Sequence, residues 1–414
     1  MEHPQRNGPH PVTPHPVTPH PAVPDPAVPH PATPHRTVPD PANPHLATPS
    51  GRPRARALGI PFGGTPGQWN AITDVPGVEV GYRTIISGDS VRTGVTALHP
   101  RGRAGALDPV AAGFFAQNGN GEMTGAAWMG ESGTFSLPVA ITNTHAVGIA
   151  HAGIIAWALR HHPELGDDWA LPVAAETWDG YLNDINGHHV TEQDCVDALE
   201  AAASGPVDEG AVGGGTGMIC YGFKGGSGTA SRLVSHAGSR YVVGVFVQAN
   251  FGSRDELVLA GMPLGDLLAG DNPVAEHRGV PPGAGSVIAV VITDAPLLPH
   301  QCTALARRVT LGLARTGTTG SHSSGDLFLA CSTANPGGFT PYSISGGGRP
   351  YDQLTFIPWG AIDPFFAAVV QGSEEAVANA LSAGEDMTGR GGHRVSALPR
   401  DRVAGLFRNP ASQG

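Results

Sequence analysis

The sequence predicts a mixed α/β fold in which layers of helix pack on layers of sheet. Two apolar runs rich in Val, residues 241–248 and 286–292, are about as long as a strand and have no polar face, which is typical of strands buried on both sides. An amphipathic helical pattern covers residues 299–314. Strands and helices come in groups rather than in strict alternation, which favours separate layers.

Periodicity and turn residues predict the remaining elements. A Pro-Gly turn at 76–77 precedes an alternating pattern that predicts a strand through Tyr82. The glycine-dotted stretch 119–133 predicts a loop, and the charged, Gly- and Pro-containing stretch 253–285 predicts an exposed connection. Further strands are expected at 136–142 and 327–332, and helices around 150–159, at 191–203, at 365–371 and at 374–381.

Composition limits the class of protein. Only 14% of the 414 residues are charged, and Gly and Pro are abundant, as in a loop-rich globular protein. The net charge of −11 and the lack of a basic cluster argue against a nucleic-acid partner. No apolar run is long enough to span a bilayer and the first residues do not form a secretory signal, so we expect no membrane contact and a cytoplasmic location. Reduced thiols in the core are expected for Cys195, Cys220, Cys302 and Cys331.

The first 52 residues differ from the rest of the chain. Proline recurs every two or three residues, which removes backbone donors and favours polyproline II, so no packed core is expected there. The recurring histidines leave two alternatives, transition-metal binding or a solvated spacer, and composition favours the spacer. We therefore predict a low-complexity tail over 1–52 and one catalytic domain over 53–414.

A glycine hinge, a serine and a buried strand meet at Gly285-Ser286. Glycine permits unusual backbone angles and leaves its carbonyl unshielded. Cleavage of the bond between Gly285 and Ser286 would give Ser286 a hydroxyl nucleophile and a free amine base in one residue. We predict that the chain cuts itself there, into an α chain ending at Gly285 and a β chain starting at Ser286.

Two other motifs leave alternatives open. The loop at 212–218 lacks the residues of a nucleotide-binding motif, so Gly214 and Gly215 are expected either to present amides to a ligand cleft or to form a tight turn. Lys224 is expected to be solvated. The cluster Ser321–Asp326 precedes a strand and is either a polar loop or, if it lies near Ser286, a proton relay. The chain contains no Gly-x-Ser-x-Gly or His-Glu-x-x-His motif.

Several motifs together resemble one family over roughly residues 57–410. They are Asp74–Gly77, Glu176–Tyr181, Val212–Gly217, Gln248–Gly252, Gly285-Ser286 and Ser324–Asp326. In this order they resemble the DmpA/BapA-type self-processing aminopeptidases, which include L-aminopeptidase/D-esterases and β-peptidyl aminopeptidases. The resemblance implies a four-layer αββα sandwich, similar to N-terminal-nucleophile hydrolases but with DmpA-type connectivity.

The resemblance also implies roles for individual residues. Ser286 matches the nucleophile, Asn250 the oxyanion-hole side chain, and Ser324 with Asp326 the supporting hydroxyl and carboxylate. Asp326 is one methylene shorter than the glutamate expected there, which leaves its reach open. Tyr181 matches a tyrosine lining the site. The expected substrate-binding residues are Glu176, for the substrate's ammonium, and Trp178, Gly214 and Gly215.

The expected activity is that of a serine aminopeptidase acting on small amides, esters or peptides with a free amine. No cofactor or metal is expected, and the resemblance implies a homo-oligomer of αβ pairs. Two alternatives remain. An acyltransferase of ornithine-acetyltransferase type would share the self-cleavage but uses a threonine nucleophile, and a non-catalytic binding module would use the tail to recruit partners.

Overall fold

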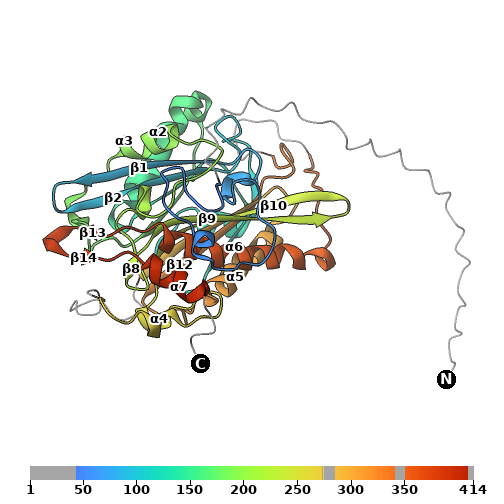
Figure 1. Cartoon of the computed structure of the whole chain (residues 1–414). Helices are drawn as coiled ribbons and strands as arrows, with labels where there is room; N and C mark the ends of the chain where they lie inside the picture. The colour runs from blue at the N-terminus through green and yellow to red at the C-terminus, as the bar shows by residue number, and fades with distance from the viewer. Residues whose placement is uncertain (1–42, 273, 275–284, 341–349, 409–414) are drawn as a thin grey trace, which may run out of the picture. The chain divides into compact units, whose positions relative to one another are not determined.

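Two β-sheets stacked face to face form the centre of the structure (Figure 1). The computed structural model describes residues 43–272, 274, 285–340 and 350–408. The four-stranded sheet has the order β1-β2-β5-β6, comprising Glu79–Ser87, Val91–His99, Val139–Asn143 and Val173–Thr177. The six-stranded sheet has the order β4-β3-β12-β11-β10-β9, comprising Thr134–Phe135, Val110–Ala116, Ser324–Ser332, Gly285–Thr293, Ser239–Asn250 and Gly226–His236.

Strand β11 shows why an apolar run of this kind must lie between two layers. Successive side chains of a strand point to opposite faces. Ile288, Val290 and Ile292 pack between the two sheets, with residues of the four-stranded sheet. The alternate residues Val287 and Val291 pack on the outer side of the six-stranded sheet. The predicted strand buried on both faces is confirmed.

Helices cover the outer face of each sheet. Helices α2 (Val147–His161) and α3 (Glu192–Glu200) contribute to a core cluster with the four-stranded sheet. Helices α5 (Pro299–Ala314) and α6 (Asp363–Ser382) contribute to the cluster on the six-stranded sheet. The layers therefore follow the order helix, sheet, sheet, helix, as the resemblance implies. The short elements are α1 (Ala126–Ser132), α4 (Leu264–Leu267), α7 (Arg400–Arg408), β7 (Ile219–Cys220), β8 (Phe223–Lys224), β13 (Met387–Thr388) and β14 (Arg394–Val395).

Three expected segments differ from the structure. The helices expected at 365–371 and 374–381 are one helix, α6, because Gly372 continues the helix where its bare backbone packs against Val245. The loop expected at 119–133 contains α1. The connection expected to be exposed is buried in its first part, where Arg254 donates to Tyr221 O at 2.8 Å. Residues 275–284 of that connection lie outside the described residues.

The folded unit extends N-terminal to the predicted boundary at residue 52. His45 Nε2 lies 3.0 Å from Gly67 O, and Arg52 Nη1 donates to Glu209 O at 3.0 Å. Proline content indicates where regular structure is unfavourable, but it does not show that distant main-chain groups bind such a segment. The rest of the predicted tail, 1–42, lies outside the described residues.

All four cysteines are buried and form no disulfide, as predicted for core thiols. Within the described ranges, none of the helices has the length and apolar character needed to cross a membrane.

Candidate active site

The six-stranded sheet brings the predicted catalytic residues to one end of three adjacent strands. Ser286 is the second residue of β11, and antiparallel pairing with β10 places Asn250 directly opposite it. Parallel pairing with β12 places Gly325 opposite Ser286 and Ser324 opposite Gly285. Neighbouring strands lie about 4.8 Å apart, so the main chains of all these residues are within side-chain reach of Ser286.

Gly285 occupies a position that admits no side chain. A Cβ atom added there would lie 2.0 Å from Asn250 O. The close approach of β10 therefore explains the glycine before the serine through packing, in addition to any role in cleavage.

A main-chain segment of the other sheet reaches Ser286. Trp178 directly follows β6, and its N–H donates to Ser286 Oγ at 3.2 Å. Asn250 Nδ2 donates to Trp178 O at 2.9 Å, and Asn250 Oδ1 accepts from Ile219 N at 2.8 Å. Ser286 and Asn250 are 3% and 5% exposed. The serine oxygen thus lies beside a main-chain N–H and close to a side-chain amide whose orientation is fixed.

Ser324 and Asp326 form a hydrogen-bonded pair on the neighbouring strand. Their side chains lie on the same face of β12 as Phe328, the outer face of the sheet, whereas Ser286 lies on the face of Ile288, between the sheets. Ser324 Oγ donates to Asp326 Oδ1 at 2.5 Å. The aspartate therefore reaches its serine despite the shorter side chain. Asn118 Nδ2 donates to Asp326 Oδ2 at 2.9 Å. Burial raises the pKa of Asp326, and the hydrogen bonds from Ser324 and Asn118 oppose that shift.

The carboxyl group of Glu176 lies alongside the start of β12. A Cβ atom at Gly121 would be 3.3 Å from Glu176 Oε1 and 3.1 Å from Gly325 Cα, so both lie next to Gly121. Glu122 N donates to Oε1 at 2.8 Å, and Thr144 Oγ1 donates to Oε2. Burial raises the pKa of Glu176, while these two donors lower it. A buried acid is thus held near the main chain of Gly325, the residue paired with Ser286.

Two predicted residues follow Glu176 along the chain. The Trp178 side chain is partly exposed, whereas its main chain contacts Ser286. Tyr181 is buried and stacks on His393, with ring centroids 4.5 Å apart and planes at 19°. His393 Nδ1 also lies 2.8 Å from Tyr181 O.

The glycine loop is a packing turn, and the ligand-cleft alternative for it is wrong. Gly214 N donates to Thr96 Oγ1 at 3.1 Å, and Gly215 N donates to Val212 O at 3.0 Å. Both glycines are buried, and a Cβ atom at Gly214 would lie 2.2 Å from Gln248 Oε1. Their amides are already bound within the protein and are not open to a substrate.

The structure also contradicts the prediction that Lys224 is solvated. Its side chain is fully buried rather than solvated, and its ammonium donates only to main-chain carbonyls in the described contacts. A single sequence gives no signal for this burial, since the three acceptors belong to turns. Asn118, which binds Asp326, follows the apolar stretch 110–116 by two residues, and it was not among the residues predicted from the sequence.

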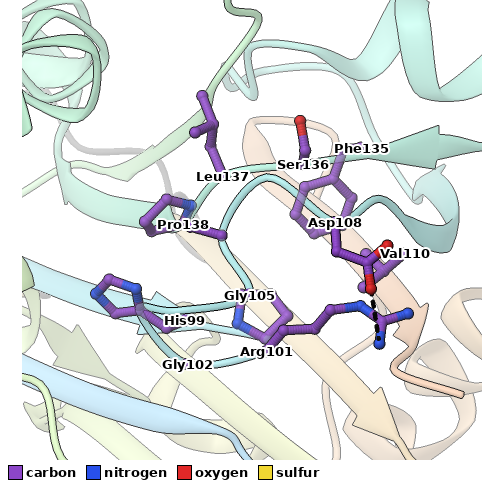
Figure 2. A pocket seen from close by; sticks show the side chains of 12 residues that line it. His99, Arg101, Gly102, Gly105, Asp108, Val110, Phe135, Ser136, Leu137 and Pro138 are labelled. Atoms are coloured by element: carbon purple, nitrogen blue, oxygen red, sulfur yellow. Dashed lines mark ion pairs between the residues drawn. The ribbon is translucent and has the colours of Figure 1, made fainter. Parts of the chain in front are cut away.

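A small pocket, drawn in Figure 2, lies at the end of β5 opposite to Thr144 and Glu176. Its wall includes Phe135–Pro138, which precede β5, whereas Thr144 and Glu176 lie at the other end. An ion pair between Arg101 Nη1 and Asp108 Oδ2, 3.4 Å apart, borders it. Within the described residues no group of three or more His, Cys, Asp or Glu side chains could hold a metal ion.

The known proteins that are similar to this chain include aminopeptidases. The model of peptidase family S58 matches residues 70–395. A β-peptidyl aminopeptidase BapA of Sphingosinicella microcystinivorans is 47% identical over 378 residues, covering 86% of this chain and 92% of that protein. The solved structure of the L-aminopeptidase D-Ala-esterase/amidase of Ochrobactrum anthropi has a TM-score of 0.81 at 44% identity, covering 88% of this chain and 100% of the other. A Burkholderia sp. β-aminopeptidase structure gives 0.78 at 44% identity, covering 86% and 99%.

The protein is therefore a hydrolase with the variant of the Ntn hydrolase fold described for the Ochrobactrum structure, and its class is that of the serine aminopeptidases. Within that class, the chain belongs to peptidase family S58.

Proposed function

We propose that the chain cleaves itself between Gly285 and Ser286, and that the new N-terminal serine is the nucleophile of the mature aminopeptidase. One observation carries the proposal. In the six-stranded sheet Ser286 pairs with Asn250 of β10 on one side and, on the other, with Gly325 of β12, the residue between Ser324 and Asp326. A nucleophile, an oxyanion donor and a supporting carboxylate are the groups that acyl transfer requires.

In the precursor, Ser286 Oγ attacks the Gly285 carbonyl carbon. The peptide C–N bond breaks, the acyl group moves to the serine oxygen, and the nitrogen becomes a free amine. Water then hydrolyses the ester, which leaves a carboxylate on Gly285 and restores the Ser286 hydroxyl. The small distance between Gly285 and the Asn250 main chain holds the scissile bond against β10.

In the mature enzyme, Ser286 attacks the carbonyl of a bound substrate. A free α-amine has a pKa of about 7.7–8.0, so near neutral pH part of it is available to accept the hydroxyl proton. Ser324, hydrogen-bonded to Asp326, is the alternative acceptor. Asn250 Nδ2 donates to the developing oxyanion in exchange for its bond to Trp178 O.

Glu176 binds the ammonium group of the substrate. A positive charge beside its carboxyl favours the ionised form and offsets the desolvation that raises its pKa. This ion pair requires a free amine, which makes the enzyme an exopeptidase. The proposed substrates are amides, esters and short peptides of L-α-, β- or D-amino acids, because the relatives are named as β-peptidyl aminopeptidase and L-aminopeptidase D-Ala-esterase/amidase. Trp178 borders the bound side chain.

Denaturing mass spectrometry of the recombinant protein tests self-cleavage. We expect two chains, the second starting at Ser286, and one intact chain from Ser286→Ala. Ser332→Ala provides a matched control, since it removes a buried serine from the far end of β12 and should still be cut. An active wild-type enzyme with an intact Gly285–Ser286 bond would refute the proposal.

A panel of L-α-, β- and D-aminoacyl p-nitroanilides and esters tests the substrate class. Hydrolysis of the free-amine compounds, and none of their N-acetylated forms, is expected. Transfer of the acyl group to an added amine in preference to water would favour the acyltransferase, and no turnover with any compound would favour the binding module.

We further propose that the two chains remain associated and that αβ pairs assemble into a homo-oligomer. Native mass measurement should give a multiple of the 42.4 kDa sum of one α and one β chain. A particle of that single mass would refute the assembly.

A further inference from the structure

The buried lysine next to the active site has no carboxylate partner among the described ion pairs. The Lys224 side chain is 0% exposed, and its Nζ donates to Met218 O at 2.8 Å, Gly225 O at 2.9 Å and Gly215 O at 3.3 Å. Burial lowers the pKa of Lys224 to about 7. Burying an ammonium group is costly, and the three carbonyls offset that cost by accepting from its three donors.

One peptide group connects this lysine to the oxyanion side chain. The carbonyl of the Met218–Ile219 peptide accepts from Lys224 Nζ. The N–H of the same peptide donates to Asn250 Oδ1 at 2.8 Å. The C=O and N–H of a planar trans peptide point in opposite directions, so fixing the carbonyl also fixes the N–H. The Asn250 amide in turn directs Nδ2 toward Trp178 O and the Ser286 side.

The connection is electrostatic as well as geometric. An ammonium that binds a carbonyl draws electron density from the peptide and makes its N–H a stronger donor, because hydrogen bonds in series polarise one another. The same effect in the Asn250 amide makes Nδ2 a stronger donor. In the water-poor interior such an effect is weakly screened.

The hairpin that carries the peptide adopts an unusual turn. Residues Tyr221 and Gly222, between β7 and β8, have φ values of +51° and +67°. The left-handed region is unfavourable for a tyrosine, and such positions cluster at functional sites. The Tyr221 hydroxyl lies 2.7 Å from Thr316 Oγ1, which anchors the turn. The hairpin is therefore held both by its turn and by Lys224.

We propose that Lys224 is a positioning residue of the active site: acting through the Met218–Ile219 peptide, its ammonium orients and polarises the Asn250 amide for the oxyanion. The proposal rests on the role of Asn250 given above. Such an effect strengthens a bond made mainly in the transition state, so it changes kcat more than KM.

Lys224→Met tests this, because it removes the charge and keeps an unbranched side chain. Rates are expressed per mole of cleaved enzyme and measured well below each variant's unfolding midpoint. We expect kcat to fall about 10- to 100-fold, with KM changed less than about threefold. In the Asn250→Ala background, Lys224→Met should change kcat less than about twofold, because residues acting through one another are not additive.

Arg232→Met is the matched control for loss of a buried cation. Arg232 is also almost fully buried, but it pairs with Glu375 at 2.6 Å and lies opposite Val243, seven residues along β10 from Asn250. It should lower stability and leave kcat unchanged. A wild-type kcat for Lys224→Met would overturn the proposal. So would a fold-change in kcat from Lys224→Met that is as large in the Asn250→Ala background as in the wild type.

Ile219→Pro decides the question if Lys224→Met does not fold. It removes the N–H that binds Asn250 and leaves Lys224 in place. A loss of kcat that disappears in the Asn250→Ala background supports the proposal, and a wild-type kcat overturns it. Failure of the proposed function is distinguishable, because the wild-type protein itself would then show no turnover.

Discussion

Replacing Asn250 by alanine separates the catalytic from the structural role of its amide. In the structure the substitution leaves Ile219 N without its acceptor and Trp178 O without its donor, at a site 5% exposed. Each unpaired buried group costs about 1–3 kcal/mol, so the free energy of unfolding should fall by about 2–6 kcal/mol. Loss of an oxyanion donor should additionally raise the activation barrier by about 2.7–4 kcal/mol, which lowers kcat about 10²- to 10³-fold.

Asn379 in α6 offers a control with the same bonding pattern. Its Oδ1 accepts from Ala55 N at 2.9 Å and its Nδ2 donates to Thr229 O at 2.9 Å, and it is fully buried. Asn379→Ala should therefore cost similar stability without affecting the chemical step. Urea unfolding gives the first quantity, and initial rates on a saturating aminoacyl p-nitroanilide give the second. If both variants had the same kcat within about threefold, the oxyanion role of Asn250 would be refuted.

Three further predictions concern the same region. Asp326→Asn keeps the side-chain size but removes the charge, so kcat should fall about 10²- to 10⁴-fold in steady-state assays, and a change confined to KM would contradict this. Gly285→Ala places a Cβ atom 2.0 Å from Asn250 O, so the chain should remain uncut on denaturing gels, unlike wild type processed in parallel. Burial raises the pKa of Asp179 to about 7, so the folded protein binds a proton that the unfolded chain, with a pKa of about 3.9, has released. Stability should therefore decrease as pH rises from about 4 to 7, by up to about 4 kcal/mol, and urea titrations should show less of this decrease in Asp179→Asn.

Local sequence patterns were sufficient to predict elements next to the candidate active site. The expected helix at 299–314 has the observed bounds of α5, because a proline at its first position marks the start and an apolar face continues to Ala314. The Val/Ile run of β11 has no polar face, so both faces of the strand must be covered by other layers. Its start at Gly285-Ser286 followed from the same pattern.

Contacts between distant parts of the chain were not predictable from one sequence. Asn118 binds Asp326 because β3 and β12 are neighbours in the sheet, a pairing that no local signal encodes. The amide of Gly214 is occupied by Thr96, far from it along the chain, so an apparently open glycine loop became a packing turn. Lys224 is buried because three carbonyls converge on it, and that convergence exists only in the folded chain.

The sheet order has a consequence for the lifetime of the cleaved protein. Strands β11 and β12, which follow the proposed cleavage site, lie between β3 and β10, which precede it. After cleavage the fragments would be interleaved within one hydrogen-bonded ladder, and neither could leave without dismantling the central sheet. Refolding would change from a unimolecular to a bimolecular reaction, so its yield would depend on protein concentration only after maturation. Slow unfolding, rather than covalent continuity, would then keep the mature enzyme in one piece.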